Sequence, residues 1–216
     1  MYDIITENNK EIQAFAQEHK LELLYITDKA QEKADCFFID SSGSKNIRKE
    51  VQQAHRKFDL VVILGNASIG KNREILESSP DILLSPHFAA GKDFMKARNA
   101  GLDSVTCKIA AKNKVAIGID FNEILHAREG EREVLLGRLM QNIKLCRKYR
   151  VRMLLASFAS SVLEMRSALD LEAFAQSIGM TPKEAQEAMQ EAGRILKRNE
   201  EKRSSSYVSE GIRVVE

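Results

Sequence analysis

The sequence predicts an α/β fold in which about seven parallel strands form an incomplete TIM-like barrel, with extra helices at the C-terminal end. Short apolar runs alternate with amphipathic helical patterns along most of the 216 residues. Repeated strand–helix units of this kind produce a parallel sheet. Several of the runs are apolar throughout, as expected for parallel strands that are buried on both faces. No shift in composition divides the chain, so we expect one domain over residues 1–198 and a flexible basic and polar tail over residues 199–216.

Seven segments have the strand pattern, and five amphipathic segments between them have the helical one. The expected strands are Tyr2–Ile5, Glu22–Ile26, Cys36–Ile39, Leu60–Leu64, Asp81–Leu84, Val115–Asp120 and Met153–Ala156. The expected helices are Glu11–Glu18, Ile47–Lys57, Arg73–Glu77, Asp103–Lys112 and Arg132–Tyr149. An open, doubly wound sheet is built from the same units, and periodicity alone does not separate it from a barrel.

Towards the C-terminus the pattern changes from strand–helix to helix–helix. Asp170 is placed to cap a helix that Gly179 ends. The segment Thr181–Glu184 then combines an N-cap threonine, a proline at the first helical position and a glutamate at the third, which together form a capping box. The buried stripe expected of that last helix consists of Ala185, Ala188, Met189, Ala192 and Ile195.

The composition excludes a membrane span and gives no overall electrostatic signature. Thirty-three basic residues nearly balance 31 acidic ones, for a net charge of +2. Any contact with nucleic acid must therefore depend on local clusters of charge. No apolar run approaches the roughly 18 residues that cross a bilayer, and the N-terminus lacks the pattern of a signal peptide. Cys36, Cys107 and Cys146 have no C-x-x-C spacing, so we expect reduced thiols in a cytoplasmic protein.

The segment Gly65–Asn72 matches a phosphate-binding loop, because it reads G-x-x-x-x-G-K between a strand and a helix. Such a loop needs Ser or Thr after the lysine, since that hydroxyl is a magnesium ligand. Here the position is occupied by Asn72. A plain turn between strand and helix is the favoured interpretation, and a P-loop-like nucleotide binder is kept as an alternative.

The histidines argue against metal-dependent hydrolysis. His19, His55, His87 and His126 are scattered singly, and none has the H-x-H, H-x-x-x-H or D-x-H spacing that brings two ligands together. His87 does follow a strand, at the end where barrel active sites lie. We expect no metal bound by this chain, and an independent metal-dependent phosphoesterase is kept as an alternative function.

The helix over residues 132–149 is expected to have a buried face and a basic one. Leu139, Ile143 and Cys146 fall on one face at 100° per residue, which makes Cys146 a core residue. Lys144 and Lys148 point the opposite way, and Arg138 and Arg147 are expected to flank the apolar stripe. This ridge suits phosphate contacts, and a solvated helix face explains it equally well. Lys108 and Lys112 have the same spacing.

The order of several segments resembles that of the ribonuclease P protein component 3 family, the archaeal counterpart of the eukaryotic thirty-kilodalton subunit. The resemblance covers roughly residues 58–198. It is carried by the segments Asn72–Glu77, Pro80–Pro86, Gly101–Asp103, Ala110–Ile117, Phe121–Asn122, Asn142–Tyr149, Met165–Leu171 and Gly179–Met180.

The resemblance implies a seven-stranded α/β barrel related to metal-dependent phosphoesterases of the polymerase-and-histidinol-phosphatase type. Those relatives carry His-x-His in the first strand, and family members often keep Asp-x-His after the last. Here these stretches read Tyr2–Glu7 and Ser157–Ser160, without either motif. We therefore expect no dinuclear metal centre and no catalytic residue in this chain.

The resemblance also implies a function within a ribonucleoprotein endoribonuclease. Ribonuclease P removes the 5′ leader of precursor tRNA, and its RNA subunit performs the Mg²⁺-dependent chemistry. This chain would bind and stabilise the catalytic ribonuclease P RNA together with ribonuclease P protein component 2, beside other protein subunits, and would meet precursor tRNA only indirectly. No cofactor of its own is implied.

Seven cations are the expected RNA contacts, because a protein that stabilises folded RNA needs positive charge spaced to meet phosphates. An ion pair with Asp170, four residues on, is an equally good explanation of the arginine at position 166. Asn72, Asn113 and Asn122 are expected to hold turns or cap helices. The RNA-contact candidates are Arg73, Lys108, Lys112, Lys144, Lys148, Arg166 and Lys197.

Overall fold

Seven parallel strands follow one another in chain order around the molecule. The computed structural model describes all residues except 45, 89–91, 94, 96, 205–206, 210–211 and 214–216, and only the backbone of 207–209 and 212–213. Each strand pairs with the next in parallel, without the reversal of order found in doubly wound sheets. The predicted barrel is confirmed. The strands are β1 (Tyr2–Ile5), β2 (Glu22–Thr27), β3 (Cys36–Ile39), β4 (Leu60–Leu64), β5 (Ile82–Leu84), β6 (Ala116–Asp120) and β7 (Met153–Ala156).

The barrel is closed between β1 and the end of β7 by a short seam. A single parallel bridge joins Ile5 to Ala159, and the amide of Thr6 donates to the carbonyl of Ala159 at 2.9 Å. Asp3 completes the seam, because its carboxylate accepts from both the amide and the hydroxyl of Ser157, each at 2.7 Å. A side chain thus replaces ladder hydrogen bonds where the sheet is incomplete.

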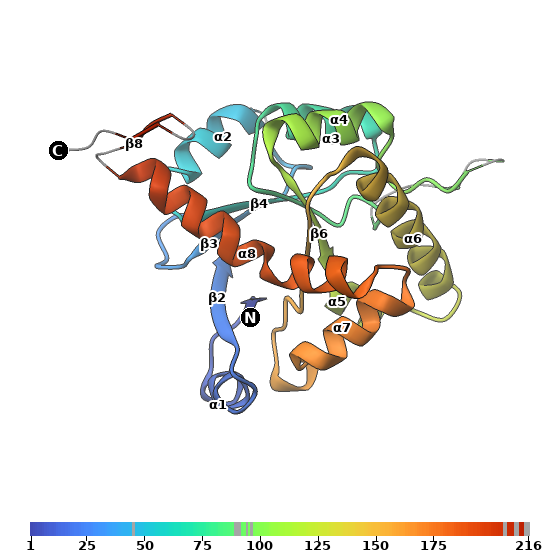
Figure 1. The fold of residues 1–216 in the computed structure, drawn as a ribbon, viewed down its shortest axis with the longest axis horizontal. Coiled ribbons are helices and arrows are strands. Elements are labelled where there is room, and N and C mark those ends of the chain that lie inside the picture. Colours follow the sequence, from blue (N-terminus) through green and yellow to red (C-terminus); the bar gives the residue numbers. More distant parts are fainter. Residues whose placement is uncertain are drawn as a thin grey trace.

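Helices surround the strands, as Figure 1 shows looking along the barrel. The predicted helices are present with small shifts at their ends, and the structure adds α5 and the 3₁₀ turn η1, neither of which was predicted. The helical elements are α1 (Lys10–His19), α2 (Ile47–Ala54), α3 (Ile69–Glu77), α4 (Ser104–Asn113), α5 (Phe121–His126), α6 (Glu131–Tyr149), η1 (Val162–Glu164), α7 (Ala168–Ser177) and α8 (Pro182–Arg203).

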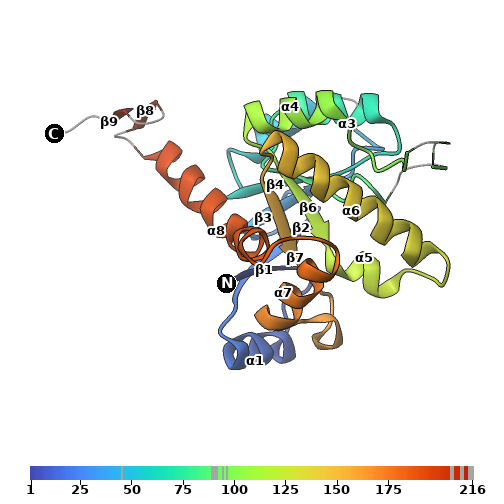
Figure 2. The ribbon, with the colours of Figure 1, turned by 45° about the vertical axis from the view of Figure 1, so that its right-hand side comes forward.

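Helix α8 closes the barrel at the N-terminal ends of its strands. Ala192 and Ile195 pack into the apolar lumen with side chains from all seven strands. Beside them, Arg198 and Asn199 donate to the buried carboxylate of Asp81, at 2.8 and 3.0 Å, just before β5. Helix α8 does not cover the opposite end of the barrel, at the C-terminal ends of the strands, which we call the open end (Figures 1 and 2).

The ends of the last two helices combine a confirmed prediction with a correction. Thr181 caps α8 in the predicted capping box with Glu184, and the predicted stripe of α8 is buried. The cap of α7 is Ser167, and Asp170 occupies the third helical position, from which it bonds back to Ser167. The prediction of Asp170 as the N-cap was wrong by three residues, because both ends of a capping box carry residues that favour caps.

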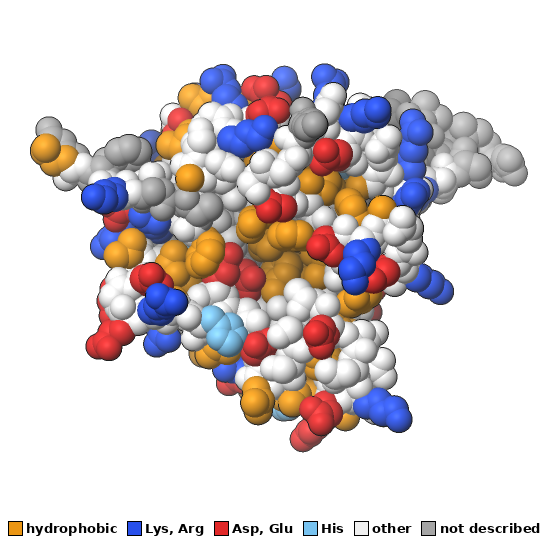
Figure 3. All heavy atoms as spheres, turned by 180° about the vertical axis from the view of Figure 1, so that it is seen from behind, with side chains coloured by type: hydrophobic (Ala, Val, Ile, Leu, Met, Phe, Trp, Pro, Cys, Tyr) orange, Lys and Arg blue, Asp and Glu red, His pale blue; other side chains and the backbone are white. Residues whose placement is uncertain are grey.

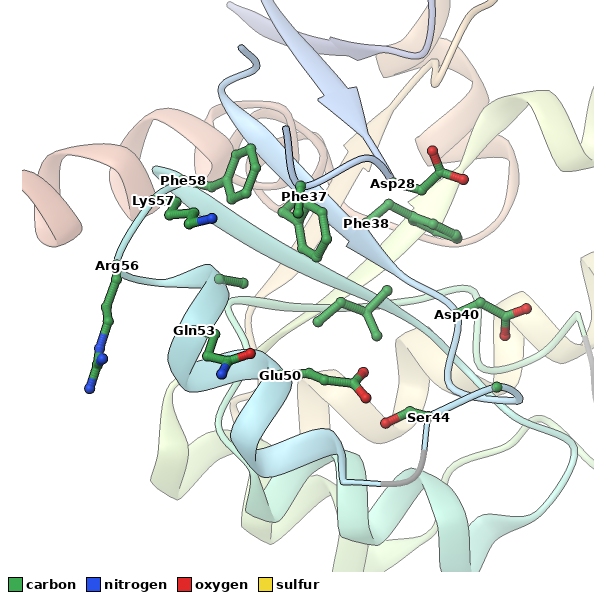
Figure 4. Close-up of a pocket in the computed structure, with 14 residues that line it drawn as sticks. Asp28, Phe37, Phe38, Asp40, Ser44, Glu50, Gln53, Arg56, Lys57 and Phe58 are labelled. Atoms are coloured by element: carbon green, nitrogen blue, oxygen red, sulfur yellow. The ribbon is translucent and has the colours of Figure 1, made fainter. Parts of the chain in front are cut away.

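Two strands are joined without a helix, and this leaves a hollow on the outside of the barrel. Residues 28–35, all of which the structure describes, connect β2 to β3 with no helical segment. A hollow of about 630 Å³ lies between β3, this connection and α2. Figure 4 shows Phe37 beside Phe58 in its wall, with their rings stacked at 4.7 Å between centroids, and charged side chains at the edge.

The C-terminal segment stays helical beyond residue 198. Helix α8 runs to Arg203, and Asn199 is buried. Further along, β8 (Tyr207–Ser209) and β9 (Ile212–Arg213) pair antiparallel. The remaining residues of the predicted tail, 205–206, 210–211 and 214–216, lie outside the described residues.

Candidate nucleic-acid interface and barrel mouth

Five of the predicted RNA-contacting cations lie on three neighbouring helices on the outside of the barrel. Helix α4 packs between α3 and α6. All five side chains are exposed, and we call this set the cationic layer. At the edge of the layer the guanidinium of Arg73 is 3.4 Å from the carboxylate of Glu77. The cationic layer consists of Arg73 on α3, Lys108 and Lys112 on α4, and Lys144 and Lys148 on α6.

Helix α6 has the orientation that its sequence pattern predicts. Leu139, Ile143 and Cys146 are buried, while Lys144 and Lys148 are exposed. The ammonium of Lys148 lies 5.5 Å from the centre of the Tyr149 ring. A basic pair one helical turn apart thus faces outwards.

The two arginines expected to flank the apolar stripe of α6 behave differently. Arg147 forms an ion pair with Glu184 at the start of α8, at 2.7 Å, so α8 partly neutralises it. Arg138 is only 6% exposed, and its guanidinium donates to Asp93 at 2.9 Å and to the carbonyl of His87 at 3.2 Å. Arg138 therefore adds no exposed charge to the basic ridge. It instead anchors the connection between β5 and α4.

The remaining two candidates lie away from the cationic layer. Lys197 is exposed on α8, at the closed end of the barrel. Arg166 follows η1, where its guanidinium donates to the carbonyls of Leu163 and Met165 and lies 5.2 Å from the centre of the Phe121 ring. The carboxylate of Asp170 bonds to Ser167. The structure thus separates the seven candidates into one group of five and two single positions.

The loop that resembles a phosphate-binding motif is built for packing. A Cβ atom at Gly65 would collide with the backbone of Pro86, so glycine is needed for the close approach of two loops. Asn72 is fully buried, and its side chain bonds to Asn66 and to the carbonyl of Gly101. Asn72 therefore holds the turn, as predicted, and its amide is occupied by these backbone contacts.

Three buried acidic side chains with raised pKa values lie at the open end of the barrel, which we call the mouth. Asp120 ends β6 and caps α5 by accepting from the amides of Asn122 and Glu123. Burial raises the pKa of Asp120 to about 7, despite these hydrogen bonds. Burial and then the charge of Asp120 raise the pKa of Glu123 to about 8. Burial likewise raises the pKa of Asp3 to about 6.

Two histidines, His87 and His126, each lie beside a glutamate in this region, but their surroundings differ. Nε2 of His87 is 3.6 Å from Oε2 of Glu123, but His87 is 1% exposed, and burial lowers its pKa to about 3. His87 is thus neutral at physiological pH. His126, which is exposed, meets Glu164 at 2.9 Å. Although burial opposes it, hydrogen bonds from Ser160 hold the pKa of Glu164 at about 2.

The described residues contain no group of three or more His, Cys, Asp or Glu side chains placed to hold a metal ion. The first strand does carry a carboxylate, Asp3, although the stretch Tyr2–Glu7 was not expected to provide a metal ligand. In the structure both oxygens of Asp3 are engaged with Ser157 in the seam of the barrel.

Sequence patterns single out His87 at the mouth, but neither Asp120 nor Glu123 was predicted as a site residue. The available signal was their position, because both follow the apolar strand β6 at its C-terminal end. Carboxyl ends of barrel strands are where functional side chains gather. Both acids are buried, however, and their burial depends on tertiary packing, which the periodicity of the sequence does not reveal.

Within the part of the chain that the structure describes, no helix is long and apolar enough to cross a membrane.

Comparison with known proteins gives a consistent family. The family model for RNase P subunit p30 matches residues 38–204. Ribonuclease P protein component 3 from Methanosarcina mazei is 37% identical over 158 residues, which cover 72% of this chain and 62% of the relative. The corresponding protein from Methanococcoides burtonii is 33% identical over 178 residues, covering 82% of this chain and 69% of the relative. The match to the Methanosarcina relative thus spans less than two thirds of its length.

Solved structures give the same fold. A chain in the cryo-EM structure of archaeal ribonuclease P with mature tRNA superposes with a TM-score of 0.73, at 24% identity, over 100% of this chain and 87% of that one. An amidohydrolase superposes with a TM-score of 0.57 at 13% identity, over 91% of this chain and 48% of the enzyme. At these identities the likeness supports the barrel fold alone.

Proposed function

The chain belongs to the RNase P subunit p30 family, and on this basis we propose that it is a protein subunit of ribonuclease P. In this role it binds and stabilises the catalytic RNA together with ribonuclease P protein component 2. The complex removes the 5′ leader of precursor tRNA. The observation that carries the proposal is the family match over residues 38–204, which includes β4 to β7 and helices α2 to α8.

The distribution of charge supports an RNA contact on the outside of the barrel. The cationic layer presents five exposed Lys and Arg side chains on three adjacent helices. Two pairs of them, on α4 and on α6, are each spaced by one helical turn. Such spacing suits successive phosphates of a folded RNA. The mouth, by contrast, carries carboxylates, which repel phosphate.

We also propose that the chemistry belongs to the RNA and its Mg²⁺, and that this chain supplies no catalytic residue and no cofactor. Support comes from the described residues, none of which form a metal-binding group of three. Further support comes from Asp3 and Ser157, at the two positions where the resemblance would place ligands, because these side chains bond to each other. The complex then contacts precursor tRNA mainly through its RNA subunit, and other protein subunits are present beside this chain.

The test is cleavage of a precursor tRNA by the cognate RNA subunit at moderate Mg²⁺. The reaction is run with the RNA alone, with this chain plus component 2, and with each protein by itself. We expect the pair to raise the cleavage rate, and the chain without RNA to leave the precursor intact. A pair that leaves the rate unchanged would refute the subunit role. Cleavage by the chain without RNA would refute only the proposal that it has no catalytic residues.

A further inference from the structure

The mouth of the barrel contains a ligand-sized hollow whose floor is apolar. Its volume is about 460 Å³, within the range of small-molecule sites. Figure 3, which views the molecule from behind, shows apolar side chains gathered at the centre of this face with acidic side chains beside them. The apolar and aromatic lining comes from β2, β3, β4, β5 and the segment after β7, and consists of Tyr25, Ile26, Phe38, Leu64, Leu84 and Phe158.

The rim of the hollow is strongly acidic. Lys29 is the one cation among the described residues that line it, and its ammonium is already 3.0 Å from a carboxylate oxygen of Glu32. The lining therefore has a net negative charge, and a phosphate or other anion would be repelled from it. The acidic side chains that line the hollow are Glu7, Asp28, Glu32, Asp120 and Glu123.

Beside the hollow are two buried polar atoms without hydrogen-bond partners, one on Glu123, which lines it, and one on His87, which does not. Oε2 of Glu123 and Nε2 of His87 are both buried and unsatisfied, 3.6 Å apart. The side chain of His87 lies behind Glu123, which lines the hollow. Burial keeps His87 neutral by lowering its pKa, so it does not balance the carboxylate. A buried carboxylate without a counter-charge is costly, so Glu123 keeps its proton near neutral pH, and its pKa is raised by burial to about 8. A bound cation would supply the missing charge and let that proton pass to solvent. Acids with such shifted pKa values are concentrated at binding and catalytic sites.

The residues that line the hollow have the chemistry that binds an organic cation. Aromatic faces and carboxylates together attract organic cations, because the ring face is electron-rich and the carboxylate carries a full negative charge. Tyr25, Phe38 and Phe158 provide rings. The apolar floor suits a hydrocarbon stem. A bare divalent metal fits less well, since the described residues offer no group of three ligands close enough to one another.

We propose that the mouth of the barrel is a binding site for an organic cation, an alkylammonium or guanidinium group on an apolar stem. The cation lies against the rings of Phe38 and Phe158 and pairs with Glu123 and Asp120. Two sources share this chemistry, a free polyamine and an arginine or lysine side chain of a protein segment. The site is on a different face from the cationic layer and does not depend on the proposed function in ribonuclease P.

The experiment is calorimetric titration of the full chain with small cations of defined chemistry. Agmatine and spermidine represent free amines, and N-acetyl-arginine amide represents a protein side chain. N-acetyl-citrulline amide and n-butanol are their uncharged counterparts, and MgCl₂ and ZnCl₂ test for a metal site. We expect saturable binding of at least one organic cation, with at least tenfold weaker binding of its uncharged counterpart. Tighter binding of the arginine derivative than of both amines would identify a protein segment as the source, and the reverse order would identify a free polyamine.

Variants locate the binding in the mouth. Glu123→Gln keeps the shape of the side chain but cannot release a proton to form the carboxylate that pairs with the bound cation. We therefore expect roughly tenfold or greater loss of affinity, as for other charge-assisted contacts. Asp28→Asn, on the exposed rim, is the second variant, chosen because it leaves the buried core untouched, and it should weaken binding several-fold. Glu133→Gln is the matched control, an exposed acid on α6 whose removal should change nothing.

Three outcomes would overturn the proposal. The first is the absence of saturable binding by all three organic cations up to millimolar concentrations. The second is equal binding of charged and uncharged probes, or binding that both Glu123→Gln and Asp28→Asn leave unchanged. The third is binding of Mg²⁺ or Zn²⁺ that excludes the organic cations, which would assign the mouth to a metal. None of these outcomes bears on cleavage of precursor tRNA, so the two proposals fail separately.

Discussion

At the scale of single residues, burial decides what a charged side chain does in this protein. Arg138 and Lys144 are six residues apart on α6, yet Arg138 is an internal anchor and Lys144 faces solvent. Asp3 and Glu123 are both buried acids at the mouth end of the barrel. The first has partners for both oxygens, whereas Oε2 of the second has none among the described residues. The type of residue alone does not distinguish these cases.

The buried acids predict that the protein loses stability as pH rises. A carboxyl group whose pKa is raised in the folded state binds its proton more tightly there than in the unfolded chain. Its contribution to stability is complete below the unfolded value, near 4.5 for Glu123, and is lost as pH rises through the folded value, about 8. We therefore expect the free energy of unfolding to fall between pH 5 and pH 8.5 in urea titrations.

Glu123→Gln should remove much of this pH dependence. At pH 8.5 the variant should be more stable than the wild type by on the order of 4–5 kcal/mol, since the pKa is raised from 4.5 to about 8 and one pKa unit corresponds to about 1.4 kcal/mol. At pH 5, where the wild-type side chain is protonated in the folded state, the two proteins should be nearly equal. Glu133→Gln serves as the exposed control. If Glu123→Gln followed the wild-type pH profile, Glu123 would not be the group whose ionisation destabilises the fold.

At the scale of elements, α4 and α6 each present one apolar face to the barrel and one basic face to solvent. Cys107 and Cys146 are both fully buried on the inner faces. Lys108, Lys112, Lys144 and Lys148 are exposed on the outer faces. Because lysines at this spacing also occur on helices that only meet water, the outer faces need a functional measurement.

The double variant Lys144→Ala/Lys148→Ala tests the cationic layer. We expect weaker binding to the catalytic RNA, and a log–log salt dependence of affinity that is flatter by roughly 0.7 to 0.9 for each phosphate that the variant no longer neutralises. The melting temperature should change little, because exposed substitutions usually alter stability by about 0.5 kcal/mol or less. Affinity would be measured by filter binding across a series of salt concentrations.

The control for this experiment removes the same charge elsewhere. Lys10 on α1 and Lys183 on α8 are both exposed and lie outside the cationic layer. The variant Lys10→Ala/Lys183→Ala therefore lowers the net charge equally. If it flattened the salt dependence as much as the first variant, the effect would reflect overall charge, and α6 would have no specific contact with RNA.

At the scale of the whole molecule, the barrel has two different ends and a distinct outer surface. Helix α8 closes one end with apolar side chains and with the bonds from Arg198 and Asn199 to Asp81. The other end is an acidic mouth, and three helices on the outside carry the cationic layer. An RNA partner is therefore expected on the outside, and a cationic ligand in the mouth.

Closure of the barrel depends on few bonds, and Ser157→Ala tests it. The variant removes the hydroxyl that donates to Asp3 at 2.7 Å and leaves one carboxylate oxygen without that partner. We expect a loss of about 1–3 kcal/mol in the free energy of unfolding. Hydrogen exchange of the Thr6 amide, which donates across the seam, should accelerate.

Ser42→Ala is the comparison for this variant, since Ser42 is exposed and its hydroxyl also bonds to an aspartate, Asp40. It should cost little and leave exchange at Thr6 unchanged. Equal stability of the two variants would show that the seam does not need the bond between Ser157 and Asp3.

Local patterns in the sequence were enough to place the elements and their order. The apolar runs predicted seven strands within a residue of their observed ends, and the capping box at Thr181 predicted the start of α8. Periodicity and capping are local, because they reflect which face of one element is buried and which amides lack partners. The same local pattern correctly predicted that Cys146 faces inwards and Lys144 outwards.

The way in which distant residues combine depends on tertiary packing. The seam between Asp3 and Ser157 joins residues 154 positions apart, and the burial of Arg138 depends on Asp93 and His87 from another segment. Glu123 has no positive partner in His87, because His87, which follows β5, is too deeply buried to carry a charge. Burial and the effective dielectric around a charge depend on everything packed against it, so a pattern within one segment does not contain them.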